Sequence, residues 1–236
     1  DISITKHVVM LWIAAAITVA LAIYGTRRYR KSENAQPKGL SHLYEILMNF
    51  IRNDIVIPNI GESQGRFWTP LITTYFLFIL TCNFLGLIPF FELIPGGSST
   101  VTGNFNTTAG LASITFFAII MAGSMKHGFL GYWKNMIPSG VPGPVLLILI
   151  PIEILGMFVR PFALTMRLGA NMTAGHIGML AIFALPIILT AAPVGIVSIL
   201  LNTGIYFLEI IVSFVQAYVF TLLSSVFIGM AIHIEH

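Results

Sequence analysis

Two arginines and a histidine stand in one strongly apolar segment, "RPFALTMRLGANMTAGHIGMLAIF", residues 160–183. Arg160 and Arg167 carry guanidinium groups that stay protonated at any accessible pH. A cation inside a bilayer is costly and needs an anion or water nearby. Histidine is the residue type used most often to handle protons near neutral pH, which makes His176 a candidate. These residue types predict a site that handles charge, or protons, inside a membrane.

Two acids lie in the long apolar stretches, Glu153 and Glu209. Glu153 is nearly four helical turns from Arg167, too far for pairing along one helix, although it can approach Arg160. Glu209 belongs to the next apolar stretch, where it can meet either Arg167 or His176. Histidine facing glutamate would form a proton-handling pair. The remaining partner for Arg167 is an acid on a second protein.

Very small residues surround Arg167 on one side of its predicted helix. At about 100° per residue, they fall within about 60° of one another. Small residues in a membrane allow another helix to approach closely. The stripe predicts either a packing face within this chain or a surface for a second protein. Its members are Ala163, Ala170, Ala174, Gly178 and Ala181.

A line of polar residues follows one face of the next apolar stretch. Glu209 is the strongly titratable member of the line, and intramembrane ionisable groups are candidates for function. Two interpretations stay open: a buried hydrogen-bond ladder between two helices, or a wet path for an ion. The line contains Asn202, Tyr206, Glu209, Ser213, Gln216 and Ser224.

The composition predicts that these residues are carried by membrane-spanning helices. The chain has 236 residues, of which 56% are hydrophobic and only 9% charged, well below the charged fraction of soluble domains. The net charge of +3 is spread over short loops and predicts no nucleic-acid surface. The single cysteine, Cys82, excludes an internal disulfide and a cysteine metal cluster.

Apolar runs predict one all-α membrane domain, residues 1–236, with about five crossings and one amphipathic surface helix. Each of the last two runs could reach about 60 Å as a helix, roughly twice the hydrocarbon core. Neither contains a central loop, so we expect two long, tilted helices with a hairpin at 186–193, the first bent at Pro151 and Pro161. The predicted ranges are 8–24, 41–57 (surface helix), 70–91, 109–125, 142–185 and 193–233.

Loop charges predict the orientation. The lysines and arginines between the predicted spans fall on one side, whereas the 92–108 loop and the 186–193 hairpin carry neither residue type. The positive-inside rule therefore places the N-terminus outside and the C-terminus inside.

Two classes of membrane protein can be compared with these residues. A stand-alone secondary transporter or ion channel also uses intramembrane charges, but it predicts an internal repeat, and none is visible. A structural scaffold leaves Arg167 and Glu209 without a purpose. No phosphate-binding glycine loop, metal-ligand spacing or Ser–His–Asp pattern is present, so we expect no cofactor, metal, bound nucleotide or nucleic acid, and no catalysis by the chain alone.

The motifs "MRLGANMTAGH" and "LEIIVSFVQAYVF" resemble subunit a of F-type ATP synthases, the stator part of the proton channel. The P-x-E at 151–153, the "RP" at 160–161 and the N-x-L-G-L-I-P at 83–89 fit the same family, and the resemblance covers nearly the whole chain. It implies two tilted helices that wrap a rotor ring of subunit c, with the peripheral-stalk subunit b and the lipid bilayer as further partners.

The resemblance also implies roles for individual residues. Arg167 would face the rotor carboxylate and separate two half-channels, and Glu153 would line the inner one. Ala163, Ala170, Ala174 and Gly178 would face the rotor. The outer half-channel would be lined by Asn83, Asn171, His176, Glu209, Ser213 and Gln216.

Three departures from the family pattern are visible. Some members have an acid at 176 and a histidine at 209, so the pair is exchanged here. Gly86 stands where some members have Asp, which puts a polar inlet group in doubt, and Gly169 stands where Phe is common. The motif style favours a bacterial plasma membrane, with the mitochondrial inner membrane second.

Overall fold

The computed structural model describes residues 6–27, 39–88, 101–135, 143–189 and 192–233, which form helices and short turns without a strand among them. This confirms the predicted all-α class. The helices are α1 (Lys6–Thr26), α2 (Leu40–Phe50), a π-helical segment (Ile51–Val56), α3 (Ile57–Ile60), α4 (Glu62–Leu87), a 3₁₀ turn (Val101–Gly103), α5 (Phe105–His127), α6 (Phe129–Asn135), α7 (Gly143–Leu189) and α8 (Ala192–Ile232).

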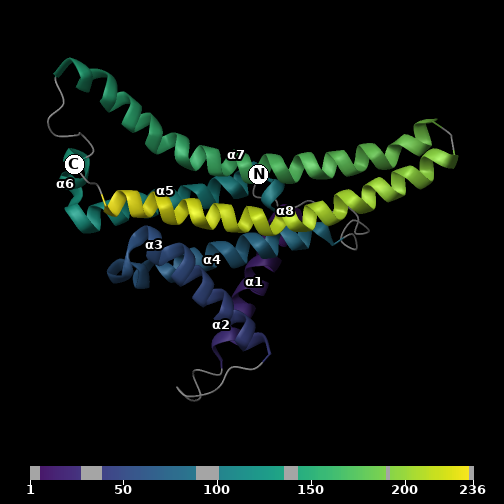
Figure 1. Cartoon of the computed structure of the whole chain (residues 1–236), viewed down its shortest axis with the longest axis horizontal. Helices are drawn as coiled ribbons and strands as arrows, with labels where there is room; N and C mark the ends of the chain where they lie inside the picture. The colour runs from purple at the N-terminus through teal and green to yellow at the C-terminus, as the bar shows by residue number, and fades with distance from the viewer. Residues whose placement is uncertain (1–5, 28–38, 89–100, 136–142, 190–191, 234–236) are drawn as a thin grey trace.

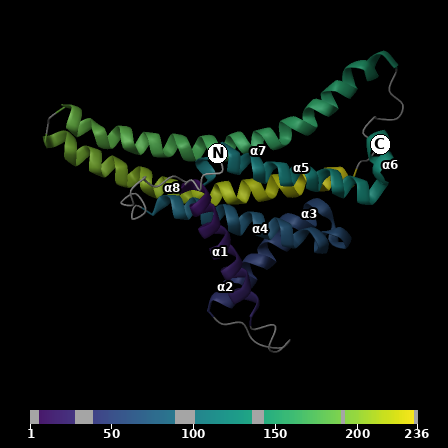
Figure 2. The same ribbon diagram turned by 180° about the vertical axis from the view of Figure 1, so that it is seen from behind.

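Five of these helices are long and apolar enough to cross a membrane: α1, α4, α5, α7 and α8. The last two runs each form one continuous helix, of 47 residues in α7 and 41 in α8. Pro151, Pro161 and Pro186 lie inside α7, and α7 is bowed in both views (Figures 1 and 2). The long-helix interpretation is therefore correct.

α7 forms one edge of the molecule, and α8 returns beside it from the hairpin (Figure 1). α5 lies between α7 and α8 in both views and packs against each of them, α4 lies beyond α8, and α1 and α2 project away from the α7–α8 pair (Figures 1 and 2). This arrangement leaves one long side of α7 without a neighbour in the described chain. Only 6% of the residues in the apolar part of α7 are buried, against 61% in the apolar part of α4.

The core lies where α4, α5 and α8 meet. Ile72, Ile79 and Ile119 are at most 1% exposed, and the rings of Tyr75 and Phe220 meet edge to face at 5.5 Å. Because lipid tails are as apolar as these side chains, the helices associate through close packing rather than through exclusion of water. This packing makes α4 and α8 a fixed frame for the polar residues that they carry.

The predicted surface helix 41–57 differs from the structure, because α2, a π-helical segment and α3 replace it. The wider turn brings the consecutive residues Ile55 and Val56 both into the core, each 0% exposed. The Ile55 carbonyl accepts hydrogen bonds from Asn59 Nδ2 at 2.6 Å and from Ser225 Oγ of α8 at 3.2 Å. The widened turn thus attaches this segment to α8.

Several predicted ends shift by a few residues. The segment between the predicted helix 41–57 and the predicted span 70–91 is helical except at Gly61, whose positive φ of 91° is a conformation that glycine adopts without strain. α4 therefore begins at Glu62, and Pro70 lies inside it instead of starting it. α5 begins at Phe105 because the Asn104 side chain accepts the backbone N–H of Asn106 at 2.9 Å. α7 runs on to Leu189, so Pro186 belongs to its last turns.

Candidate functional site: a charged face and a buried His–Glu pair

Arg167 lies on the open side of α7. Its side chain is exposed, and among the described residues no carboxylate lies within ion-pair distance of it. The small residues predicted around it are also open: Ala163, Ala170 and Ala174 are exposed, and Gly178 is half-buried. The described chain therefore does not use this stripe as a packing face of its own.

The opposite side of α7 packs against the bundle. Its buried residues are Met157, Leu164, Leu168 and Met172, which recur at helical spacing. His176 is nine positions after Arg167, about 180° away around the helix. The geometry separates the arginine from the histidine by the full width of α7.

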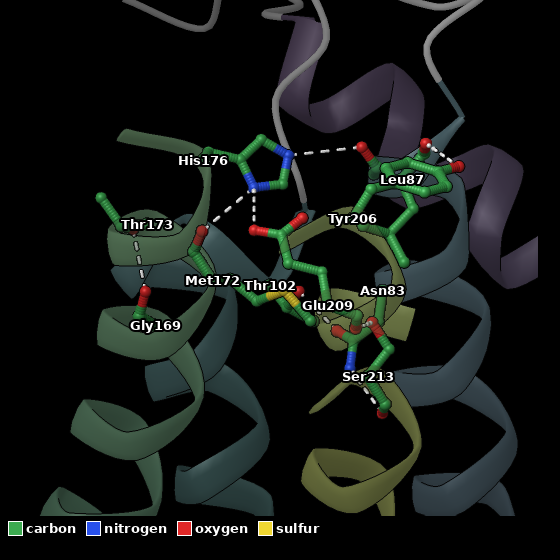
Figure 3. Close-up of polar contacts among 11 residues, drawn as sticks. Asn83, Leu87, Thr102, Gly169, Met172, Thr173, His176, Tyr206, Glu209 and Ser213 are labelled. Atoms are coloured by element: carbon green, nitrogen blue, oxygen red, sulfur yellow. Dashed lines mark hydrogen bonds and ion pairs between the residues drawn. The ribbon is translucent and has the colours of Figure 1, made fainter. Parts of the chain in front are cut away.

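His176 meets Glu209 across the α7–α8 hairpin. His176 Nδ1 lies 3.8 Å from Glu209 Oε1 (Figure 3). Glu209 is 5% exposed, and neither of its carboxylate oxygens accepts a hydrogen bond from the described residues. Glu209 therefore pairs with the histidine of its own chain and not with Arg167, which settles the alternatives that the sequence left open for it.

Backbone carbonyls orient the histidine ring. Nδ1 lies 3.1 Å from the Met172 carbonyl oxygen, one turn earlier in α7. Nε2 lies 3.4 Å from the Gly86 carbonyl oxygen of α4 (Figure 3). Next to it, Tyr206 OH donates to the Leu87 carbonyl at 3.0 Å. The last carbonyls of a helix have no partner inside the helix, so the end of α4 offers acceptors to both side chains.

Gly175 provides the space for the carboxylate. A Cβ added at this position would overlap Glu209 Oε1. The absence of a side chain lets the carboxylate lie against the α7 backbone, beside His176. This contact explains why a glycine precedes the histidine in the motif.

Asn83 and Ser213 form a second polar cluster below the pair. Asn83 is 0% exposed, and its Nδ2 donates to the Ser213 carbonyl at 3.1 Å. Its Oδ1 accepts from Thr102 Oγ1 at 2.7 Å, and Ser213 Oγ donates to the Glu209 carbonyl at 2.8 Å. Each of these side chains makes a hydrogen bond that ties the cluster to neighbouring backbone or side chains (Figure 3).

The other predicted site residues lie farther from the pair. Asn171 is exposed and stands about 40° from Arg167 around α7, so it shares the arginine face. Gln216 is 5% exposed and lies about two turns beyond Glu209 in α8. The side chain of Glu153 lies outside the part of the chain that the structure describes, so its place stays a prediction.

Arg160 is held differently from Arg167. Its guanidinium carbon lies 5.7 Å from the centre of the Phe227 ring of α8, in a cation–π contact. Burial raises the pKa of Tyr132 in α6, against the lowering effect of Arg160. Arg160 thus stabilises packing between α7 and α8, whereas Arg167 has no such contact in the described chain.

A cavity of about 1080 Å³ opens beside the pair. Its wall comes from the end of α4, the start of α5, α7 and α8, and it includes both His176 and Tyr206. Glu209 and Arg167 do not line it. His176 therefore borders the cavity and also lies beside Glu209. Other polar lining residues are His7, Asn104, Asn106, Thr173, Asn202 and Thr203.

Three features of the site were missed by the sequence analysis: the carbonyls of Gly86 and Leu87, the Thr102–Asn83 bond, and the contact between Gly175 and Glu209. Backbone acceptors leave no signature in residue type, and the Thr102 contact joins a loop to a helix across 19 positions. Of these residues, only Gly175 could have been singled out from the sequence, because it is the glycine directly before His176 in the motif "MRLGANMTAGH". Among the described residues, no three His, Cys, Asp or Glu side chains gather where they could share a metal ion.

Comparison with known proteins supports the resemblance of the motifs. The chain is 44% identical to "ATP synthase subunit a" of Chloroherpeton thalassium over its whole length, which covers 69% of that relative. It is 46% identical to "ATP synthase subunit a 2" of Chlorobaculum tepidum over 98% of the chain and 64% of the relative. The chain thus spans about two thirds of the length of these relatives. The family model "ATP synthase A chain" matches residues 8–229, and the chain belongs to this family.

Proposed function

We propose that this chain is the proton-conducting stator subunit of a rotary ATP synthase and carries no catalytic chemistry of its own. The observation that carries the proposal is the division of α7 into two sides. One side presents Arg167 on a stripe of small, uncovered residues, and the other carries His176, which lines the cavity and lies beside Glu209 of α8. Family membership supports this function over a stand-alone transporter or channel.

The outer half-channel begins at the cavity. By the positive-inside rule, the α4–α5 connection that borders the cavity faces the outer side. A proton that enters the cavity meets His176 in its wall and then Glu209 behind it. From Glu209 the proton passes toward a carboxylate of the rotor. Asn171 and Gln216 complete this outer path in the proposal.

Arg167 is the separator between the two half-channels. Its guanidinium cannot give up a proton at any accessible pH, so it cannot relay one. Its positive field favours the ionised form of a rotor carboxylate that arrives opposite it. The same field repels protons that would cross directly from the outer to the inner path. A potential of 100 mV is worth about 2.3 kcal/mol per proton, so such a leak would waste the driving force.

The partners follow from these roles. The uncovered stripe of Ala163, Ala170, Ala174 and Gly178 faces a ring of subunit c, whose helices carry the acid that Arg167 meets. Subunit b of the peripheral stalk holds the chain against rotation. Glu153 lines the inner half-channel. The five apolar helices place the protein in a membrane, and the bacterial relatives favour a bacterial plasma membrane over a mitochondrial one.

Disulfide trapping tests this arrangement directly. We expect Ala174→Cys, in a Cys82→Ala background, to cross-link to a cysteine placed beside the acid of the ring subunit. The matched control is Val19→Cys, which is exposed on α1 away from α7, and it should not cross-link. Equal yields at both positions, or purification of the intact complex without a ring subunit, would refute the proposal.

A further inference from the structure

The 3₁₀ turn Val101–Gly103 is buried although it belongs to the connection between α4 and α5. Val101 is 1% exposed and Thr102 is 0% exposed. Val101 packs with Ala14 of α1 and Cys82 of α4. Connections between helices usually run over the surface, because their backbone polar groups need partners. A turn that enters the bundle therefore calls for a specific explanation.

Thr102 links the turn to α8 through Asn83 of α4. Thr102 Oγ1 donates to Asn83 Oδ1 at 2.7 Å. The Ser213 carbonyl can only accept, so Nδ2 of the amide faces it at 3.1 Å and Oδ1 faces the Thr102 hydroxyl. Ser213 is one helical turn after Glu209 and donates its own hydroxyl to the Glu209 carbonyl. Thr102 thus acts on the backbone of α8 beside the carboxylate (Figure 3).

Gly103 links the turn to α7 through its carbonyl oxygen. Thr173 Oγ1 lies 3.4 Å from the Gly103 carbonyl oxygen and also donates to the Gly169 carbonyl at 2.8 Å. Thr173 is three residues before His176 in the same helix. Gly103 therefore contacts α7, which carries His176, and Thr102 is linked to α8, which carries Glu209, through Asn83 of α4.

The pair needs this external support. The Glu209 carboxylate accepts no hydrogen bond from the described residues, so its position depends on where the α8 backbone is held. The 3.8 Å between His176 Nδ1 and Glu209 Oε1 is longer than a hydrogen bond. A small shift of α8 relative to α7 would therefore change the separation of the two groups directly.

We propose that the Val101–Gly103 turn is a positioning element that sets the separation of His176 and Glu209, with Thr102 as its principal positioning residue. This inference rests on the proposed function, because it concerns the rate at which the outer half-channel delivers protons. In this proposal, the Thr102–Asn83 hydrogen bond holds His176 and Glu209 at the separation that proton transfer needs. In this assignment, Asn83 acts through the Ser213 carbonyl and does not itself carry protons.

The first test removes the hydroxyl alone. Thr102→Val keeps the shape of the side chain but leaves Asn83 Oδ1 buried without its donor. We expect proton pumping by the intact complex in lipid vesicles to fall about tenfold, the usual scale for one lost buried hydrogen bond. Thr102→Ser should restore most of the rate. The matched control is Thr81→Val on α4, whose buried hydroxyl bonds only to the Leu77 carbonyl of its own helix and should change the rate less than about twofold.

A double variant separates positioning from simple stability. Thr102→Val with Asn83→Leu replaces both partners by apolar groups, which is often nearly neutral for folding. If the turn acts only on stability, thermal stability and transport recover together. If it positions the relay, stability recovers while transport stays slow, and the outer pH for half-maximal rate differs from that of the unaltered complex. Joint recovery, or a wild-type rate in Thr102→Val, would overturn the inference.

Arg167→Ala in the same vesicles distinguishes the two proposals. If Arg167→Ala abolishes coupled transport and Thr102→Val does not alter it, the positioning inference fails and the proposed function stands. If coupled transport survives Arg167→Ala, the proposed function itself fails, whatever Thr102→Val does.

Discussion

Arg167 and His176 share one helix and point to opposite sides of it. The arginine is exposed on the open side of α7, and the histidine lies 3.8 Å from Glu209 on the packed side. A permanent cation and a titratable pair are thereby kept apart without a second helix between them. This separation lets each side of α7 be tested alone.

Removal of the permanent charge should uncouple the motor. We expect Arg167→Ala to abolish ATP synthesis in reconstituted vesicles under an imposed proton gradient and to raise passive proton flux. Arg167→Lys should also fail, because an ammonium is a compact, strongly hydrated charge that can lose its proton in apolar surroundings.

The matched control is Arg160→Lys. Lysine keeps a cation that can lie over the Phe227 ring, so most of the ATP synthesis rate should remain. Full synthesis in Arg167→Ala would contradict the role of the arginine, and complete loss in Arg160→Lys would show that any change of arginine in α7 is harmful.

The buried pair should control proton entry. Glu209→Gln keeps the size of the side chain but removes the titratable group, so we expect initial rates of proton pumping to fall by about 10²-fold, within the usual range for one proton-transferring group. His176→Gln should slow entry in the same way.

An exchange variant tests whether the pair works as a unit. His176→Glu with Glu209→His keeps one acid and one imidazole, so it should pump faster than His176→Glu alone, which places two acids side by side. The same pumping assay compares the variants. Unaltered pumping in Glu209→Gln would reduce Glu209 to a packing residue.

Gly175 should tolerate no added side chain. A methyl group there overlaps Glu209 Oε1, so Gly175→Ala must displace the carboxylate or separate α7 from α8. We expect destabilisation by about 1–3 kcal/mol, as for other overpacked sites, together with slower proton entry. Thermal denaturation of the purified complex and the pumping assay measure the two effects.

Gly110→Ala on α5 is the matched control, since a Cβ at Gly110 meets no atom within 4 Å. It should leave proton entry unchanged and should not lower the thermal stability, because alanine is favoured over glycine inside a helix. If Gly175→Ala resembles this control, then the close approach of Glu209 to α7 has no importance for the site.

Much of this architecture could be predicted from the sequence because the membrane restricts the choices. Apolar length indicated five crossings, and the lack of a loop within 142–185 or 193–233 indicated two long helices. The angular position of Arg167 relative to His176 followed from helical geometry alone. The meeting of His176 with Glu209 was one of two options, because sequence gives the facing sides of two helices but not their register.

The remaining features depend on tertiary contacts. Pro70 was predicted to start a span, but packing of α4 in the core keeps the helix continuous through it. The 41–57 segment was predicted as one amphipathic helix, whereas the structure has a π-helical turn within it, where Ile55 and Val56 are both buried. Thr102 gave no signal, since its partner Asn83 lies across a loop whose path the sequence does not specify.

The carbonyl of Gly86 makes one of the contacts that orient the imidazole of His176. This oxygen belongs to the main chain, so no ordinary codon change at position 86 deletes it. A mutational scan that replaces side chains one at a time would therefore pass over this acceptor. Backbone ester substitution weakens one carbonyl oxygen as an acceptor and leaves every side chain in place. It would bring this otherwise invisible contact within reach of experiment.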